Sequence, residues 1–437
     1  MRNSKLWRIT LLLAVLALVA AACSDTGGLP AECEDDPFGC VEIGAGEPIE
    51  VGTLLVITGP NAFLGQDSQN GVVLAADYLP TAAEAEAGEG GTFDGVNGEL
   101  FGHTIAFNHQ DDGCSADGGQ VGAQALAADT SVVAVIGTSC SSAALGVADK
   151  ILSDNGIAII SPSNTGPALT EPSQHQPFYL RTAHNDKLQG AAVANFAYNE
   201  LGARTAATIH DGSPYADGLQ AVFAEKFEEL GGAITVQDAI QVGDTDFTSV
   251  LTTVAANPPD VLYFPIFVAE GGLMAQQAAQ TAGLENTTLV GSDGMLTQGF
   301  LDAAGEASVG MYLSGPDLSA FSGDAAFYEG AFKTAYAADF GGEPAAAFHA
   351  HSYDATVMLF EAIKKVAIED GDTLYIPRTA LKDALFETQG LLGITGTLNC
   401  NADGDCQSTA VIGVYQVESP SGLPATPVYS EQASLEG

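Results

Sequence analysis

The chain has 437 residues, which is long enough to bury two hydrophobic cores of ordinary domain size. Its 13 Lys and Arg residues stand against 55 Asp and Glu residues, giving a formal net charge of −42. Such a surface repels nucleic acid and anionic lipid headgroups, so we expect no nucleic-acid partner. Because the carboxylates are spread along the chain, they indicate a solubilising surface suited to a saline environment rather than a calcium or polycation site.

The first residues have the pattern of an export signal. Three basic residues precede an apolar run over residues 9–19 that is too short to span a bilayer comfortably. The run ends in three alanines and Cys23, a pattern that resembles the lipobox of bacterial lipoproteins, in which the cysteine is diacylated and becomes the new N-terminus. We therefore expect a signal peptide over residues 1–22 and a lipid on Cys23. The protein would be exported and anchored to the membrane, in the periplasm or at the cell surface; an ordinary secretory signal is the alternative.

Three segments are predicted to lack regular secondary structure. Residues 23–48 are rich in Gly, Pro, Asp and Glu and predict a flexible linker behind the lipid. Residues 80–99 are rich in Ala, Glu and Gly without apolar periodicity, which favours an exposed loop. Residues 428–437 are expected to form a disordered tail.

Strands and helices alternate from residue 49 onward. The predicted strands cover residues 51–58, 104–110, 132–136, 157–161, 205–210, 234–242, 261–265 and 289–291. The predicted helices cover residues 67–78, 120–128, 143–155, 187–201, 215–230, 247–256 and 273–282. Many of these strands are continuously apolar, which is typical of parallel sheets covered by helices on both faces. Because the alternation restarts near residue 187, the sequence predicts an α/β fold with two doubly wound lobes.

The cysteine count fits an exported protein. If Cys23 carries lipid, six of the seven cysteines remain, an even number suited to three disulfides in an oxidising compartment. The expected pairs are Cys33–Cys40 and Cys400–Cys406, which are close in sequence, and Cys114–Cys140, which remain as a longer-range pair. A zinc site is the alternative, but no paired Cys-x-x-Cys spacing is present, so we expect neither a metal nor a cofactor.

Polar turns follow two neighbouring strands of the first lobe. Residues 138–142 and 161–166 are rich in Ser and Thr, and each segment follows a predicted strand. Ligands of open parallel sheets bind beyond the carboxyl ends of the strands, and hydroxyls with backbone N–H groups there suit a carboxylate. For Ser141 alone, a simple helix cap is the alternative.

The second lobe offers an acidic counterpart. Tyr215 lies at the start of a predicted helix, and Asp293 follows the strand over residues 289–291. An acidic residue opposite a hydroxyl-lined turn is what a zwitterion requires, since its ammonium needs an anion and its carboxylate needs donors. Phe267, near another strand end, is expected to line the same pocket, with core packing as the alternative for the aromatic residues beside it.

Taken together, these motifs resemble the substrate-binding proteins of branched-chain amino acid ABC transporters, the leucine/isoleucine/valine type of the type I periplasmic binding fold. The resemblance covers residues 49–417. It is carried by the order and spacing of Thr58-Gly59-Pro60 with Gly65, residues 111–114, 136–142 and 160–162, residues 180–182 with Asp186, and residues 210–211 with Tyr215 and Gly218.

The resemblance implies a binding function and a ligand set. It places Ser141 and the Thr165 N–H on the carboxylate of a small amino acid. It places the Ser163 carbonyl, the Thr165 hydroxyl and Asp293 on the ammonium, with Tyr215 reaching in from the second lobe. The implied partners are the amino-acid ligand and an ABC permease in the membrane, and the implied state is a monomer.

Further positions complete or modify this set. Asp186 and Leu64 belong to the expected ligand-binding residues. Leu64 stands where the family often has an aromatic residue, and Asp293 stands where the leucine-type proteins usually have glutamate. The Cys114–Cys140 pair matches a disulfide of close relatives.

The resemblance also implies how the lobes are divided. Chains of this family cross between their lobes three times, through a three-stranded hinge whose bending closes the lobes over the ligand. The crossings are expected near residues 182–185, 313–316 and 392–395. Lobe 1 would comprise residues 49–183 and 315–391, and lobe 2 residues 184–314 and 392–427.

Two other functions compete with this interpretation. A hydrolase is disfavoured, because no Gly-x-Ser-x-Gly surrounds Ser141 or Ser163 and no His-Glu-x-x-His is present. His349 and His351 would point apart on a helix and cannot share a metal there. The second alternative is a sensor or binding module of the same fold for amides, urea or small carboxylates, for which Asp293 would lack a partner.

Overall fold

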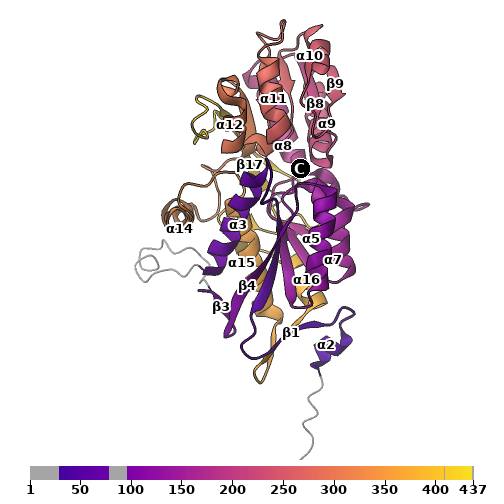
Figure 1. Cartoon of the computed structure of the whole chain (residues 1–437), viewed down its shortest axis with the longest axis vertical. Coiled ribbons are helices and arrows are strands. Elements are labelled where there is room, and N and C mark those ends of the chain that lie inside the picture. Colours follow the sequence, from indigo (N-terminus) through magenta and orange to yellow (C-terminus); the bar gives the residue numbers. More distant parts are fainter. Residues whose placement is uncertain (1–28, 78–95, 408, 436–437) are drawn as a thin grey trace, which may run out of the picture.

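The computed structural model describes residues 29–77, 96–407 and 409–435. The predicted signal peptide, Cys23 and residues 80–95 of the predicted exposed loop lie outside these described residues. Two α/β lobes are stacked end to end along the longest axis of the molecule (Figure 1). No helix in the described ranges is both long and apolar enough to cross a bilayer.

Lobe 1 is built on a six-stranded sheet. Across the sheet, the strands are β3 (Glu99–Leu100), β4 (His103–Asp111), β2 (Ile49–Leu55), β5 (Val132–Gly137), β6 (Ala158–Ser161) and β7 (Tyr179–Arg181). All neighbours pair in parallel except β3 with β4. Every residue of β5 is buried, because helices cover both faces of this central strand.

The helices of lobe 1 cover the two faces of this sheet. They are α3 (Ala62–Asp77), α5 (Ala116–Ala128), α6 (Ser141–Ala143), η1 (Ala144–Ala148), α7 (Asp149–Asp154), η2 (Pro167–Thr170), α13 (Ala325–Phe327), η6 (Tyr328–Phe332), α14 (Lys333–Phe340), α15 (His349–Val366) and α16 (Arg378–Phe386). Apolar residues of α3 and α15 share one core with one face of the sheet, and those of α5 and α7 share a second core with the other face.

Lobe 2 is built on a seven-stranded sheet. Across the sheet, the strands are β18 (Tyr429–Ser434), β17 (Thr409–Gln416), β12 (Tyr312–Pro316), β11 (Thr288–Gly291), β10 (Val261–Tyr263), β8 (Thr205–His210) and β9 (Ala233–Ala239). The strands from β12 to β9 are parallel, whereas β17 and β18 are antiparallel to their neighbours. The helices are α8 (Asp186–Asn195), η3 (Phe196–Glu200), α9 (Pro214–Glu229), α10 (Thr248–Ala255), α11 (Val268–Ala278), η4 (Asp293–Met295), α12 (Gln298–Ala304) and η5 (Gly305–Ser308).

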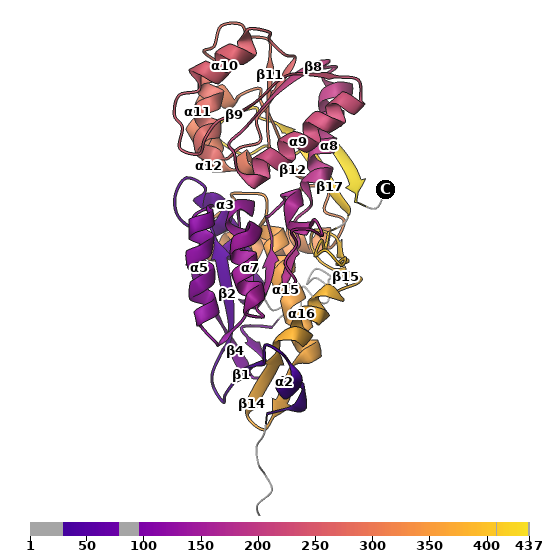
Figure 2. The same ribbon diagram turned by 90° about the vertical axis from the view of Figure 1, so that its right-hand side faces the viewer.

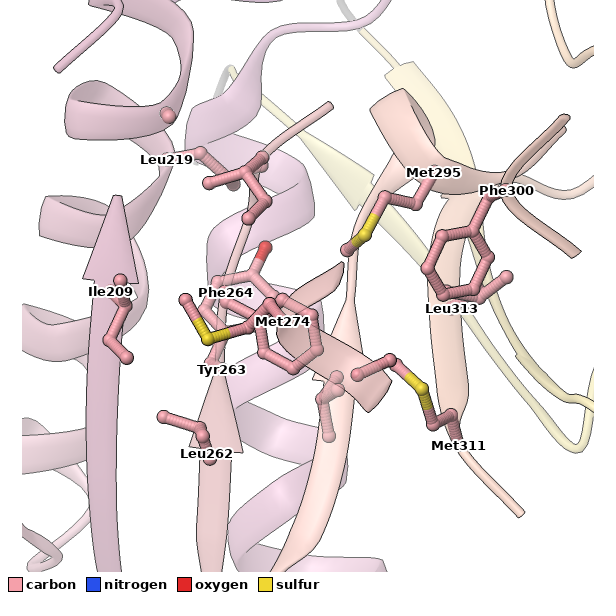
Figure 3. Close-up of a cluster of buried hydrophobic side chains, with 14 of the residues drawn as sticks. Ile209, Leu219, Leu262, Tyr263, Phe264, Met274, Met295, Phe300, Met311 and Leu313 are labelled. Carbon is pink, nitrogen blue, oxygen red and sulfur yellow. The ribbon is translucent and has the colours of Figure 1, made fainter. Parts of the chain in front are cut away.

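The core of lobe 2 supports the turn that follows β11. Phe264, Met274, Phe300 and Leu313 are fully buried beneath the carboxyl ends of the central strands (Figure 3). Met295, the last residue of η4, points into this cluster, so η4 is fixed to the core through its own side chain. The turn that carries Asp293 therefore rests on closely packed apolar groups.

Local sequence signals explain where several helices begin. Ser115, Ser213 and Thr297 each precede a helix and accept a hydrogen bond from a backbone N–H in its first turn. Such caps satisfy donors that the helix itself leaves unpaired. Gly65 in α3 has a different role, because a Cβ there would lie 2.0 Å from the Val56 carbonyl oxygen. The glycine lets α3 approach the end of β2.

The chain passes between the lobes three times. It leaves β7 for α8 through residues 182–185 and leaves β12 for lobe 1 after Pro316. Cys400 and Cys406 still pack in the lobe 1 core, and the described chain next joins lobe 2 at β17 (Thr409–Gln416), so the prediction that lobe 2 resumes at residue 392 is wrong. Residues 391–406 remain with lobe 1, as described next.

Side chains and backbone groups before the third crossing are held by lobe 1. A short hairpin joins β15 (Leu391–Leu392) and β16 (Thr397–Leu398), and Leu398 is buried in the lobe 1 core. Asp354 of α15 accepts hydrogen bonds from the N–H groups of Ile394 and Thr395, at 2.7 and 2.9 Å. A buried carboxylate binding two backbone donors could not be anticipated from local sequence.

The N-terminal linker prediction is wrong for part of its length. Residues 31–35 form helix α2 (Ala31–Asp35), and β1 (Cys40–Ile43) pairs with β14 (Thr373–Pro377), which also pairs with β13 (Ile368–Asp370). Thr379 beside β14 donates its N–H and hydroxyl to Asp36. This small sheet lies at the end of lobe 1 remote from lobe 2 (Figure 2).

The predicted disordered tail is also wrong for residues 429–434. These residues form β18, which pairs along its length with β17 at the edge of the lobe 2 sheet. Its exposure alternates along the strand, so a two-residue period was present in the sequence but short and mostly polar.

The three predicted disulfides are present. They are Cys33–Cys40, Cys114–Cys140 and Cys400–Cys406. The first disulfide joins α2 to the start of β1. The second joins the residues just before α5 to the turn before α6, and the third closes a loop just before the third crossing.

Candidate functional site

The polar turns of the two lobes meet where the parallel strands of each sheet end. Beyond β5 and β6 in lobe 1 lie residues 138–142 and 162–166, and beyond β8 and β11 in lobe 2 lie residues 211–215 and 292–295. A Cβ added at Gly218 of α9 would come within 3.0 Å of Pro167, which places the lobe 1 turns against lobe 2. The site thus lies between the lobes, at the edge of the sheets where ligands of such folds bind.

Hydroxyl groups join the two turns of lobe 1. The Ser163 hydroxyl donates to the Ser139 carbonyl (3.0 Å), and the Ser141 hydroxyl accepts from the Gly166 N–H (3.2 Å). Both serines are therefore fixed by their partners. In contrast, the buried hydroxyl of Thr165 makes no close hydrogen bond, although it interacts with the Asp186 carboxylate and partly offsets the raised pKa of that group. A buried polar group with incomplete hydrogen bonding is costly, so a ligand group that bonded to the Thr165 hydroxyl would be stabilised.

Asp293 is the acidic centre of the lobe 2 side. Its carboxylate accepts hydrogen bonds from the Tyr215 hydroxyl (2.8 Å) and from Nε2 of Gln189 (2.7 Å). The Tyr215 hydroxyl also lies 2.6 Å from the Ser292 hydroxyl, and the Phe267 ring packs 5.1 Å from the Tyr215 ring. Burial raises the pKa of Asp293 to about 6. The hydrogen bonds therefore fix the orientation of the carboxylate, but they do not fully offset its loss of hydration.

Asp186 brings a second carboxylate to the same site. Its backbone N–H donates to the Thr165 carbonyl (2.9 Å), and its carboxylate makes no close hydrogen bond, although it interacts with the Thr165 hydroxyl. Burial, followed by the charge of Asp293, raises the pKa of Asp186 well above its usual range. Two buried carboxyl groups whose charges interact would both be stabilised by a cationic group near them.

Enclosure of the site is nearly complete. The predicted site residues are each at most 7% exposed; they are Leu64, Ser141, Ser163, Thr165, Asp186, Tyr215, Phe267 and Asp293. Leu64 belongs to the hydrophobic cluster that also contains Cys140 and Tyr215, so this cluster includes residues of both lobes. The lobes also touch at Gly299, where a Cβ would lie 2.9 Å from the Phe63 ring.

Sequence reasoning missed Gln189, which links the site to two of the crossings. Its amide oxygen accepts from Nε2 of His184 (2.5 Å), and its amide nitrogen donates to both Asp293 and the Ser314 hydroxyl (3.0 Å). His184 lies in the first crossing, and Ser314 lies in β12, just before the second. The only sequence signal was a polar residue on the apolar face of α8, which by itself does not indicate a partner.

A buried arginine was also missed as a functional group. Arg181 ends β7, is fully buried, and pairs through Nε with Asp405 at 2.5 Å. Arg181 lies within residues 180–182, one of the segments that carry the family resemblance. An arginine at the end of an apolar strand was the available signal, since such a charge requires a partner when buried.

The described ranges, residues 29–77, 96–407 and 409–435, contain no group of three or more His, Cys, Asp or Glu side chains suited to a metal. His349, one of the histidines considered for such a role, instead binds Asp67 through Nδ1 (2.9 Å) and lies 2.8 Å from the Tyr328 hydroxyl through Nε2. These contacts belong to the packing of α3, η6 and α15.

Two α/β lobes linked by three crossings, with a buried polar site between them, define a two-lobed solute-binding protein. The family model described as periplasmic binding protein matches residues 48–419. The chain belongs to this family, which consists of binding proteins rather than enzymes. The hydrolase alternative is therefore set aside, and the type I periplasmic binding fold is confirmed.

Relatives place the chain more closely within the family. It is 30% identical over 356 residues to the Leu/Ile/Val-binding protein homolog 1 of Brucella abortus, covering 81% of this chain and 86% of that protein. It is 27% identical to the leucine-, isoleucine-, valine-, threonine- and alanine-binding protein of Pseudomonas aeruginosa, covering 83% of this chain and 88% of that protein. The resemblance drawn from the motifs is confirmed.

Among solved structures, the fold is similar to the branched-chain amino acid transporter substrate-binding protein LivJ of Streptococcus pneumoniae in complex with isoleucine. The TM-score is 0.71 at 23% identity, and the match covers 89% of this chain and 99% of that chain. At this identity the similarity concerns the fold.

Proposed function

We propose that this protein is the solute-binding component of an ABC importer and captures a small α-amino acid between its lobes by hinge closure. The observation that carries the proposal is the buried Asp293 carboxylate, which Tyr215 and Gln189 orient beside Asp186 and Thr165. No basic side chain of the described residues is among the groups that act on Asp293, so a ligand ammonium there would supply its counter-charge. The relatives named for binding branched-chain amino acids support this choice.

The two ends of the ligand are bound by opposite chemistry. The Ser141 hydroxyl and N–H and the Thr165 N–H receive the carboxylate, whereas the Ser163 carbonyl, the Thr165 hydroxyl and Asp293 receive the ammonium. Charge-assisted hydrogen bonds at both ends fix the orientation of a zwitterion and offset its desolvation. Because Asp293 belongs to lobe 2 and the serines to lobe 1, a bound amino acid stabilises the closed arrangement.

The side chain of the ligand extends toward apolar groups. Leu64 from lobe 1 and Phe267 from lobe 2 are both buried at the site. Because apolar groups contact each other favourably when water is excluded, we propose that a small or medium apolar side chain is preferred.

The cellular setting belongs to the same proposal. The protein is exported, carries a diacylglyceryl group on Cys23, acts as a monomer, and delivers its ligand to an ABC permease. Two acyl chains give stable membrane attachment where one gives only marginal binding.

A ligand screen with matched compounds tests the proposed function. We expect leucine, isoleucine, valine, alanine or threonine to raise the melting temperature of the purified protein, since a ligand at 100 times its Kd adds about 2.7 kcal/mol to stability. The matched control for leucine is 4-methylpentanoate, which has the same carbon skeleton without the ammonium and should bind far more weakly. Binding of 4-methylpentanoate, benzoate, acetamide or urea with no response to any amino acid would contradict the proposal and favour the sensor alternative.

A further inference from the structure

A buried ion pair lies directly beneath the ligand-binding turn of lobe 1. Arg181 at the end of β7 pairs with Asp405, and the two side chains are 0% and 7% exposed. Neither residue belongs to the proposed ligand contacts. A buried guanidinium needs an opposite charge and hydrogen-bond acceptors to offset its loss of hydration. The position of Asp405 therefore determines where Arg181 can lie.

The guanidinium of Arg181 holds the turn that contains Thr165. One of its terminal nitrogens, Nη1, donates to the carbonyls of Asn164 (3.1 Å) and Gly166 (3.0 Å), the residues on either side of Thr165. The other, Nη2, donates to the Thr170 hydroxyl (2.7 Å). The peptide groups that flank Thr165 are therefore fixed by a single charged side chain.

The loop closed by the Cys400–Cys406 disulfide holds Asp405. Within this loop the Asp405 N–H donates to Oδ1 of Asn401 (3.0 Å), and the Asn401 N–H donates to the Asp405 carbonyl (2.9 Å). Backbone hydrogen bonds join the loop to Arg181, whose N–H donates to Gly404 and whose carbonyl accepts from Cys406. The same loop leads directly into the third crossing.

We propose that Asp405 is a positioning residue for the ligand's carboxylate: it holds Arg181 against the Asn164–Gly166 turn, and the Cys400–Cys406 disulfide holds Asp405. This inference rests on the proposed function, because it requires that the turn bind a carboxylate. Without Asp405, Asp186 is the other carboxylate whose charge acts on Arg181. A move of the guanidinium toward Asp186 would displace the carbonyls on either side of Thr165 and weaken binding.

The first experiment compares two disulfides in the full chain. L-leucine affinity is measured by calorimetry for the parent, Asp405→Asn, the double variant Cys400→Ser/Cys406→Ser, and the control Cys33→Ser/Cys40→Ser. The control removes a disulfide of similar span, with a sequence separation of 7 rather than 6, at the remote end of lobe 1. We expect Asp405→Asn and the Cys400/Cys406 variant to bind at least tenfold more weakly, and the control to stay within twofold of the parent.

A double-mutant cycle separates positioning from general damage. If Asp405 acts through the turn around Thr165, its effect overlaps with that of Ser141→Ala, so the two losses are less than additive. The loss from Tyr215→Phe, which acts through Asp293 of lobe 2, adds fully. Unchanged affinity in Asp405→Asn, or additive losses with both partners, would overturn the inference. If Asp405→Asn does not fold, the cycle is run with the Cys400/Cys406 variant. A parent protein that binds neither L-leucine nor any other amino acid of the screen would instead refute the proposed function.

Discussion

Replacing Asp293 by asparagine should affect ligand binding and ligand-free stability in opposite directions. Asparagine keeps the shape of the side chain and an oxygen that accepts from Tyr215 and Gln189, but it removes the negative charge. The change therefore tests the charge itself and leaves the packing of η4 intact.

The loss of affinity follows from an ammonium left without its anion. Truncating one partner of a buried, hydrogen-bonded charge pair costs about 2–5 kcal/mol. Because the Ser163 carbonyl and the Thr165 hydroxyl remain as acceptors, we expect a value near the lower end, about 2–3 kcal/mol, which is roughly 30- to 150-fold in Kd.

The gain in ligand-free stability follows from the pKa of Asp293. Burial raises this pKa from 3.8 to about 6. At about 1.4 kcal/mol per pKa unit, the ionised carboxylate costs the empty protein roughly 3 kcal/mol at neutral pH. The uncharged amide of the Asp293→Asn variant avoids this cost, so the melting temperature of the ligand-free variant should rise.

Calorimetric titration and thermal melts of the same samples measure both effects. Asp302→Asn is a suitable control, because Asp302 is exposed on α12 of the same lobe and accepts from Gln298. The control should match the parent in both assays. An Asp293→Asn variant that binds the amino acid as tightly as the parent, or that melts earlier without ligand, would refute the reasoning.

Three further predictions concern pH, a disulfide and the anchor. Burial raises the pKa of Asp112 to about 7 and those of Asp149, Asp293 and Asp354 to about 6, so between pH 4 and 7 these carboxyls bind more protons in the folded than in the unfolded state. They outnumber the buried histidines His184 and His351, whose lowered pKa values act in the opposite direction. The free energy of unfolding should therefore fall as pH rises. Thermal melts of the ligand-free protein in molar salt should give a higher melting temperature at pH 5 than at pH 8. A higher melting temperature at pH 8 would contradict this prediction. Removing Cys114–Cys140 with two serines should lower the free energy of unfolding by about 3 kcal/mol, measured by denaturant titration, because the crosslink closes a loop with a sequence separation of 26. Cys23→Ser should move the exported protein from the membrane to the soluble fraction, and equal membrane retention of both forms would rule out acylation.

The repeating part of the fold could be predicted from the sequence. Continuously apolar strands such as β5, flanked by helical segments, indicated parallel sheets covered on both faces. The cysteine spacing suggested all three disulfides. These features depend on local pattern, where period and composition carry the information.

The parts that were missed depend on partners distant in sequence. β1 is a strand because Val41 and Ile43 pair with β14, more than three hundred residues later in the chain. The hairpin after residue 391 stays with lobe 1 because Asp354 binds its backbone. In the site, positions at strand ends indicated Ser141, Tyr215 and Asp293, and the family resemblance completed the ligand set. Gln189, in contrast, owes its role to three partners on other elements. No periodicity encodes such contacts.

The two ends of the described chain belong to different lobes. Strand β1 and helix α2 are fixed to the remote end of lobe 1, whereas β18 forms the edge of the lobe 2 sheet. A change in the angle between the lobes therefore changes the distance between the chain ends. Fluorophores attached beside Leu29 and Leu435 would report that angle without touching the ligand site, and the protein could be immobilised through its N-terminal segment while lobe 2 stays free to move.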